Sequence, residues 1–151
     1  MEDLPHQVAL ARDIATRAHA GQTRKLGLDR GLPYIVHPTR VAQAVQHHSE
    51  VAWAAGLLHA VVEDCGYTEN KLLREGVSPE VAKVVCIVSR ASSAWGEGYG
   101  ETYRQFILRI KASGNDAALA VKLADLRDNM SDLEVGSMLD KYELAEYILT
   151  T

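Results

Sequence analysis

The chain has 151 residues and carries 16 Lys and Arg against 20 Asp and Glu, so its formal net charge is −4. Hydrophobic residues make up 47% of the sequence, which suits one compact domain with a buried core and excludes a disordered chain. We expect a single domain over residues 1–151. The negative charge disfavours a polynucleotide-binding module, because such modules normally carry a surplus of basic residues.

The sequence predicts neither a membrane span nor a secretion signal. Its longest apolar run, residues 51–62, is too short to cross a bilayer and contains His59. The N-terminus lacks the basic and apolar regions of a signal peptide, so we expect a cytoplasmic protein without a membrane partner. Cys65 and Cys86 are the only cysteines, and we expect two buried thiols rather than a disulfide.

Apolar residues recur at helical spacing along almost the whole chain, which predicts an all-α fold, a bundle of about eight helices. Ser49, Thr68 and Ser78 each precede a predicted helix and can cap its N-terminus. The helix over residues 50–64 is apolar on most sides, so we expect it at the centre of the bundle. In chain order, the expected helices cover residues 4–20, 38–48, 50–64, 69–74, 79–90, 103–112, 117–130 and 138–149.

Two glycine-rich stretches interrupt the predicted helices. Residues 21–33 also carry Arg24 and Lys25 and are expected to form a polar loop. Residues 91–100 contain three glycines and predict a mobile loop around Trp95. Trp95 could cover a bound ligand or simply anchor this loop.

Polar side chains interrupt the predicted core at four places. His37 lies at a helix start, His59 lies within the most apolar helix, and Glu63 and Asp64 follow one turn later. Asp125 lies inside another predicted helix. Because residues four apart share a helix face, His59 and Glu63 can address one site. Two imidazoles and a carboxylate from three helices form a ligand set suited to Mn²⁺, Fe²⁺ or Zn²⁺.

A simpler interpretation stays open for each of these residues. A lone buried histidine such as His59 is more often a hydrogen-bonded core residue than a metal ligand. Asp125 could be the buried partner of a nearby Arg or Lys. Glu63 and Asp64 could be a solvated helix end, although acidic side chains near a helix C-terminus oppose its macrodipole.

Four runs of sequence carry a family resemblance that covers nearly the whole chain. They are residues 18–25 (AHAGQTRK), 33–38 (PYIVHP), 56–64 (GLLHAVVED) and 121–130 (VKLADLRDNM). In this order and at these distances they resemble the HD-domain (p)ppGpp hydrolases, and more narrowly the single-domain small alarmone hydrolases of the RelA/SpoT hydrolase class. The length implies a stand-alone hydrolase module without the synthetase and regulatory domains of long alarmone enzymes.

The resemblance implies an HD-type helical domain that holds Mn²⁺, or another divalent metal. It implies hydrolysis of the 3′-pyrophosphate of ppGpp or pppGpp, which releases pyrophosphate and GDP or GTP. His37, His59 and Asp125 match metal ligands of the family. Glu63 and Asp64 match the catalytic acidic pair that positions and activates water.

The same resemblance implies a small nucleotide as the binding partner. Arg24 and Lys25 match residues that line the nucleotide-base pocket, and Asn129 matches a residue that contacts the nucleotide. Many relatives have a basic residue where this chain has Ser131, so the contact that this basic residue makes with the nucleotide is not expected here. The further candidates for phosphate binding, each of which could equally be a solvated surface residue, are Tyr103, Arg109, Lys122 and Arg127.

One position departs from the family pattern. Ala60 stands where the acid of the His-Asp doublet is expected, which removes one metal ligand and one negative charge. Loss of groups that only orient a ligand costs about 10- to 100-fold in metal affinity or activity, so we expect weak or absent turnover. An inactivating substitution and a natural protein that binds the alarmone without cleaving it both fit. An HD phosphatase acting on another nucleotide, such as NADPH, is a further alternative.

Overall fold

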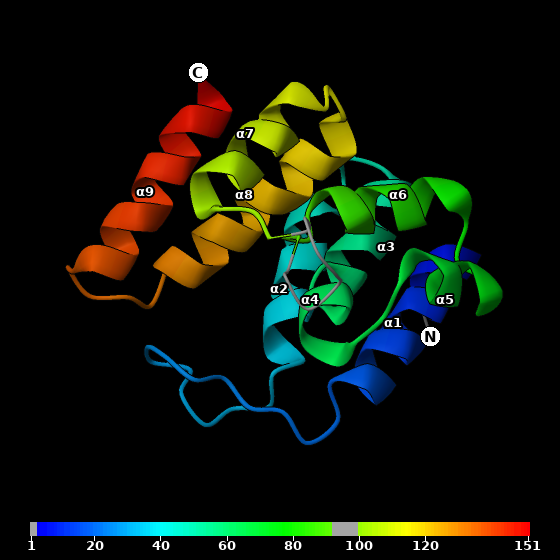
Figure 1. Ribbon diagram of the computed structural model, residues 1–151. Coiled ribbons are helices and arrows are strands. Elements are labelled where there is room, and N and C mark those ends of the chain that lie inside the picture. The colour runs from blue at the N-terminus through cyan, green and yellow to red at the C-terminus, as the bar shows by residue number, and fades with distance from the viewer. Residues whose placement is uncertain (1–2, 92–99) are drawn as a thin grey trace.

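The computed structural model describes residues 3–91 and 100–151 and has the all-α fold that the sequence predicts (Figure 1). The β-structure in these residues is an isolated antiparallel bridge between Thr23 and Pro33, which closes the polar loop. The predicted loop around Trp95 lies outside the described residues. The helices are α1 (His6–Ala18), α2 (Val36–Val45), α3 (Glu50–Leu58), α4 (Val61–Cys65), α5 (Glu69–Arg74), α6 (Pro79–Ile87), α7 (Tyr103–Ala112), α8 (Asp116–Met130) and α9 (Ser137–Thr150).

The three predicted helix caps are confirmed. The side chains of Ser49, Thr68 and Ser78 each accept a hydrogen bond from the backbone N–H three residues later, at 3.0, 3.1 and 3.3 Å. Each bond satisfies a backbone donor that the first turn of a helix leaves without a partner. These caps therefore fix the starts of α3, α5 and α6.

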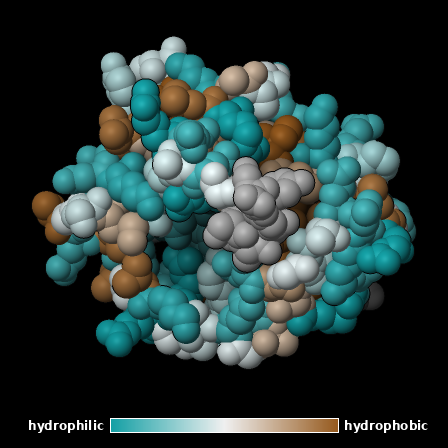
Figure 2. Space-filling view, viewed as in Figure 1, coloured by the Kyte–Doolittle hydropathy of each residue, from teal (hydrophilic) through white to brown (hydrophobic). Residues whose placement is uncertain are grey.

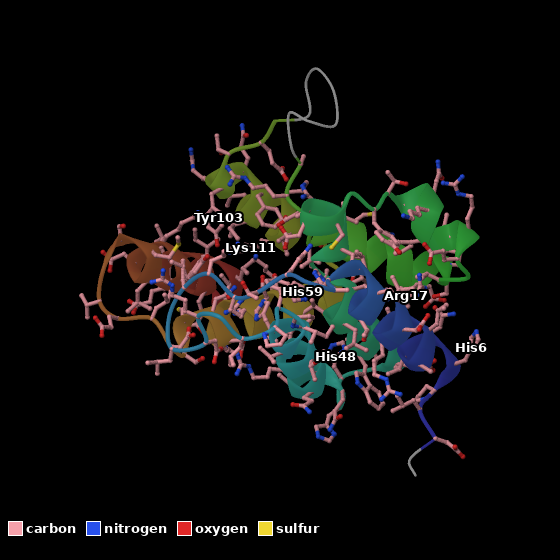
Figure 3. The ribbon with its side chains drawn as sticks, turned by 90° about the horizontal axis from the view of Figure 1, so that it is seen from below. His6, Arg17, His48, His59, Tyr103 and Lys111 are labelled. Carbon is pink, nitrogen blue, oxygen red and sulfur yellow. The ribbon has the colours of Figure 1, made fainter. Side chains whose placement is uncertain are left out.

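Helix α3 lies at the centre of the bundle, as its all-round apolar sequence predicts. It packs on α1, α2, α6 and α8, and its residues from Ala54 to Leu58 are buried. Gly56 permits the close approach of α2, because a Cβ at this position would lie 2.9 Å from the Cα of Ala42. The central helix thus delivers His59 to the middle of the molecule, whereas His6 and His48 lie at the periphery (Figure 3).

Helix α8 joins two hydrophobic clusters. Its residues Ala118, Val121 and Ala124 belong to the large core built around α3. Leu126 belongs to a smaller cluster formed with α7 and α9. Asp125 lies between Ala124 and Leu126 in the sequence and is itself buried, so α8 carries a buried polar residue next to members of both clusters.

The expected single helix over residues 50–64 is divided, and this expectation is therefore wrong in detail. His59 is the C-cap residue of α3 and Ala60 is the N-cap residue of α4. The ring N–H of His59 at Nδ1 donates to the backbone oxygen of Gly56 at 2.7 Å, which ties the imidazole to the end of the helix. Glu63 and Asp64 consequently lie within the single turn of the short helix α4, and Asp64 directly precedes its last residue, Cys65.

Two expectations about cysteines and membranes can also be compared with the structure. Cys65 and Cys86 are free, as expected, but they are half-buried and not fully enclosed. None of the described helices combines the length and the apolar character that a bilayer crossing requires.

Candidate metal and nucleotide site

Three buried ligand atoms converge where α2, α3 and α8 meet. Nε2 of His37 lies 2.8 Å from Oδ1 of Asp125. Nε2 of His59 lies 3.2 Å from Nε2 of His37 and 3.4 Å from the same oxygen of Asp125. The structure thus brings together the three residues that the sequence singled out as metal ligands.

The hydrogen bonds that each ring makes through Nδ1 determine whether its Nε2 carries a proton or a lone pair. The Nδ1–H of His59 donates to the backbone oxygen of Gly56, and Nδ1 of His37 lies 2.6 Å from Oδ2 of Asp128. A neutral imidazole protonated at Nδ1 carries a lone pair on Nε2. Two lone pairs then face each other and a carboxylate oxygen, and they repel unless a cation or a proton lies between them.

The spacing of these atoms fits a metal ion. Ligands held about 2.1 Å from a transition metal lie roughly 3.0–3.4 Å from one another. The two separations from His59, 3.2 and 3.4 Å, fall within this range, and the 2.8 Å between His37 and Asp125 is slightly shorter. Two imidazoles and one carboxylate on adjacent corners form a ligand set known for divalent metals with open positions.

A proton can take the place of the cation. Burial acts to lower the pKa of His37, but hydrogen bonds to Asp125 and Asp128 outweigh it and raise the pKa. Burial acts to raise the pKa of Asp125, yet Lys122 and both histidines hold it well below its usual range. The site therefore keeps an ionised carboxylate beside a histidine that can hold a proton when no cation is bound.

Asp128 is a site residue that the sequence analysis missed. Besides its bond to His37, it forms an ion pair through Oδ1 with Nε of Arg40, at 2.9 Å. It lies three residues from Asp125 and so on the same face of α8, which is the signal that could have identified it. Metal-binding histidines typically donate their second N–H to such a carboxylate, which fixes the ring orientation.

Lys122 supplies a buried positive charge beside the three ligand atoms. Its ammonium donates to Oδ2 of Asp125 at 2.9 Å and lies 4.9 Å from the ring centroid of Phe106. Burial acts to lower the pKa of Lys122, but the charge of Asp125 outweighs it and raises the pKa. Asp125 is therefore left with one oxygen directed at the two histidines.

A cavity of about 190 Å³ opens onto the three ligand atoms. Ala60, Glu63 and Asp64 line it, and three cations lie on its walls, namely Arg90, Lys122 and Lys141. Partial desolvation raises the pKa of Glu63, although its carboxylate accepts a hydrogen bond from the backbone N–H of Arg90, which acts in the opposite direction. The predicted acidic pair thus borders the same space as the histidines.

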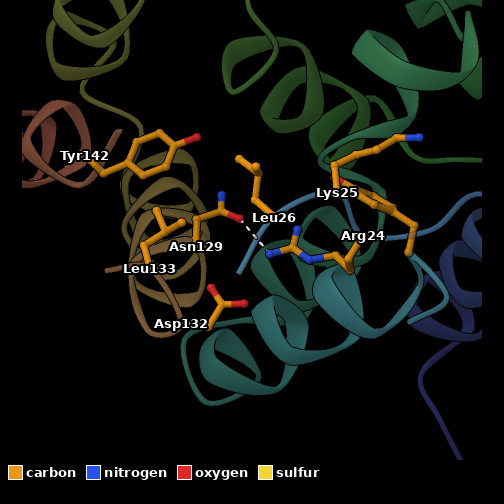
Figure 4. A pocket seen from close by; sticks show the side chains of 8 residues that line it. Arg24, Lys25, Leu26, Asn129, Asp132, Leu133 and Tyr142 are labelled. Atoms are coloured by element: carbon orange, nitrogen blue, oxygen red, sulfur yellow. Dashed lines mark hydrogen bonds between the residues drawn. The ribbon is translucent and has the colours of Figure 1, made fainter. Parts of the chain in front are cut away.

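A second cavity of about 220 Å³ adjoins the first, and both are lined by Tyr34, Asn129 and Tyr142. Arg24 and Lys25 border this second cavity, which the close-up view shows (Figure 4). The guanidinium of Arg24 reaches across to α8, where Nη2 donates to Oδ1 of Asn129 at 3.1 Å, while Lys25 points away from Asn129 (Figure 4). The molecular surface has a hydrophilic hollow on this face (Figure 2).

Asn129 connects the two cavities. It accepts from Arg24 and donates through Nδ2 to Oδ1 of Asp125 at 3.0 Å. A chain of polar contacts therefore runs from the loop over residues 21–33 to the predicted metal ligands.

The further candidates for phosphate binding divide into two groups. Tyr103 and Lys122 line the first cavity. The hydroxyl of Tyr103 is buried without a hydrogen-bond partner among the described residues, and burial raises the pKa of Tyr103 to about 12. Arg109 and Arg127 line neither cavity of the site.

Arg109 and Arg127 are held by other partners. The guanidinium of Arg109 pairs with Glu101 at 2.8 Å and donates at 2.9 Å to the backbone oxygens of Ile87 and Ser89. Arg127 pairs with Glu146 at 2.9 Å. The structure therefore does not bring these two side chains to the candidate site.

Residues 11–147 match the HD domain family. Over 126 residues the chain is 36% identical to a guanosine-3′,5′-bis(diphosphate) 3′-pyrophosphohydrolase of Haemophilus influenzae. This alignment covers 80% of this chain and 18% of that protein. Over 129 residues it is 33% identical to a GTP pyrophosphokinase of Myxococcus xanthus, covering 80% of this chain and 16% of that protein. The chain thus spans less than a fifth of the length of these curated relatives.

A solved structure has the same fold. It is described as a metazoan ortholog of SpoT that hydrolyzes ppGpp and plays a role in starvation responses. The match covers 99% of this chain and 86% of that chain, with a TM-score of 0.74 and 20% sequence identity. This likeness supports the helical arrangement described above.

Proposed function

This chain belongs to the HD-domain family, and on that premise we propose that its site binds ppGpp or pppGpp and is built to hydrolyse the 3′-pyrophosphate, releasing pyrophosphate and GDP or GTP. The observation that carries the proposal is the meeting of His37, His59 and Asp125 at a cavity that continues into a second cavity bordered by Arg24. The names of the Haemophilus relative and of the solved metazoan structure support this choice of substrate.

In this proposal His37, His59 and Asp125 hold the divalent metal; their ligand set suits Mn²⁺, Fe²⁺ or Zn²⁺, and Mn²⁺ is the ion that the family resemblance implies. When bound, such a cation supplies Lewis-acid activation of a phosphoryl group and of water. The chemistry that remains for the protein is to orient the nucleotide and to move protons.

Glu63 and Asp64 are the proposed catalytic acids. Hydrolysis requires a group that takes the proton of the attacking water, and a proton must reach the 3′ oxygen that leaves. The raised pKa of Glu63 suits it to accept and release a proton at a higher pH than an ordinary carboxyl group. The adjacent Asp64 lines the same cavity and can relay the proton.

The nucleotide is proposed to span both cavities. Arg24 and Lys25 hold the purine base in the second cavity by stacking and hydrogen bonding. Asn129 contacts the nucleotide at the junction of the two cavities. Lys122 and the hydroxyl of Tyr103 contact the phosphates in the first cavity. These cations supply positive charge locally although the whole chain is acidic.

Ala60 limits turnover in this proposal. Its methyl group lines the cavity where a carboxylate would provide a further ligand, and it is only 4% exposed. The present site can therefore bind the alarmone while cleaving it slowly or not at all. The same observation favours the second candidate function, a protein that binds the alarmone without hydrolysing it.

Turnover measurements separate these possibilities. With Mn²⁺ present, pyrophosphate release from ppGpp and pppGpp and phosphate release from NADPH are measured for the chain and for Ala60→Asp, with Ala60→Asp/His59→Ala as the inactive control. We expect a clear gain on the guanosine substrates for Ala60→Asp. If Ala60→Asp binds ppGpp but releases no pyrophosphate, the chain is a binding protein. Phosphate release from NADPH alone would replace the alarmone with another nucleotide.

A further inference from the structure

Helices α7 and α9 leave an apolar groove open to solvent, away from the ligand atoms of the site. The groove has a volume of about 440 Å³, and its apolar lining comes from Ile107, Leu108, Leu144, Ala145 and Ile148. Hydrophobic surface is visible over α7 and over the neighbouring α9 (Figure 2). Exposed apolar surface bordered by polar residues is typical of surfaces that bind another protein.

Among the described helices, α7 and α9 carry most of the exposed large hydrophobic side chains, and two of these, Leu108 and Leu144, line the groove. Of the described helices, α5 exposes Leu73, whereas α7 exposes Leu108 and α9 exposes Met138, Leu144 and Tyr147. Leu144 and Tyr147 are the most exposed of these, at 61% and 65%. Exposing apolar surface to water is unfavourable in a monomer, and free energy is gained when another surface covers this face.

The two exposed stripes beside the groove differ in charge, although Lys141 of α9, which lines the groove with Arg104, is also positive. One exposed stripe on α7 carries two positive charges. It consists of Arg104, Leu108 and Lys111, which are spaced four and three residues apart and so share a helix face. On α9 the stripe consists of Asp140, Leu144 and Tyr147 at the same spacings, and it begins with a negative charge. Each stripe therefore has a leucine at its centre, and the two stripes have opposite charge.

We propose that this face joins two copies of the chain, with the α7 stripe of one copy packed along the α9 stripe of the other. A two-fold axis repeats the contact, because each copy presents both stripes. Leu144 and Tyr147 then cover the partner's groove, and Arg104 of each copy faces Asp140 of the other. Like-signed stripes would meet if α7 packed on α7, so the charges select the crossed pairing.

The groove also shares a wall with the candidate site. Tyr103 and Lys141 line both the groove and the first cavity, and Lys141 lies 4.0 Å from the ring centroid of Tyr103. The next residue, Tyr142, lines both cavities of the site. A second copy on α7 and α9 therefore supports the wall against which a ligand binds, whatever the reaction.

Analytical ultracentrifugation over a range of protein concentrations tests the interface. The 16.5 kDa chain is expected to approach twice this mass as the concentration rises. Leu144→Asp should raise the dimer dissociation constant at least about tenfold, because it places a charge in the apolar contact. The matched control is Leu28→Asp, at a loop position that is 88% exposed and lies off this face.

A charge exchange tests the pairing of α7 with α9. Arg104→Glu and Asp140→Arg should each weaken the dimer, and the double variant should restore most of the lost affinity. A chain that stays monomeric at every concentration, or a dimer that survives Leu144→Asp, would overturn the interface. Failure of the double variant to recover would overturn the crossed pairing. Circular dichroism confirms that each variant is folded, which is expected because the substituted side chains are exposed.

Discussion

His37 and Asp128 are joined by a hydrogen bond of 2.6 Å between Nδ1 and Oδ2. The carboxylate accepts the ring proton and so directs the lone pair of the opposite nitrogen, Nε2, toward Asp125. Arg40 holds Asp128 from the other side. The candidate metal site thus depends on a residue that contacts neither the predicted metal position nor the nucleotide cavities.

Replacing this carboxylate should weaken metal binding. Asp128→Ala leaves the His37 ring free to change its tautomer and its orientation, so the affinity for Mn²⁺ is expected to fall about 10- to 100-fold. Isothermal titration calorimetry measures the change, best in an Ala60→Asp background where binding is tightest. Glu134→Ala is the control, since it removes an exposed carboxylate from the loop between α8 and α9. Equal affinities for the two variants would contradict the role assigned to Asp128.

The metal-free protein should lose stability as the pH rises. Because the pKa of His37 is raised above 6.5 in the folded state, its protonated ring stabilises the fold fully below pH 6.5, and this contribution is lost as the pH rises through the raised value. The free energy of unfolding, measured in EDTA by urea titration between about pH 6 and 9, should therefore fall. The pKa values of Asp125 and Asp128 are lowered, so these carboxylates stay ionised throughout this range.

Two comparisons isolate the contribution of His37. Burial lowers the pKa of His19, which acts in the opposite direction, so the chain is compared with His37→Gln and the difference in slope is taken. Saturating Mn²⁺ should abolish the loss of stability, since a metal replaces the proton between the two histidines. The same slope in both proteins, or with and without metal, would show that His37 does not titrate as described.

The loop cations should contribute unequally to nucleotide binding. Arg24 is held toward the site by its bond to Asn129, whereas Arg30 is exposed on the same loop. Arg24→Ala should weaken ppGpp binding by about 10- to 100-fold, the usual cost of a lost hydrogen bond to a charged group. Arg30→Ala should leave the dissociation constant nearly unchanged. Binding is measured by calorimetry with the present chain, and equal losses for both variants would indicate non-specific attraction.

Most of the fold follows from local sequence signals. Caps at Ser49, Thr68 and Ser78 determine three helix starts, and the sequence range predicted for α7 agrees with the structure. The break at His59 could not be predicted, because the apolar pattern continues through it. It depends on the bond from the histidine ring to Gly56, which becomes visible only when the ring position is known.

The site was predictable where a polar residue interrupts an apolar face. His59 and Asp125 stand out in this way. Asp128 follows Arg127 near the end of α8, so sequence alone suggests a solvated turn, and its function depends on the packing of α2 against α8. Arg109 illustrates the opposite error, because a basic side chain that looks available for phosphate is held by Glu101 and two backbone oxygens.

The most direct test of the site is the affinity for Mn²⁺ of the present chain and of Ala60→Asp, measured by calorimetry on metal-stripped protein. If His37, His59 and Asp125 form an incomplete metal site, restoring the carboxylate should tighten binding at least about 10- to 100-fold. His59→Ala in the same background should remove the gain. Equal and weak binding by both proteins would contradict a metal centre at these residues, and with it the hydrolytic function proposed for the chain.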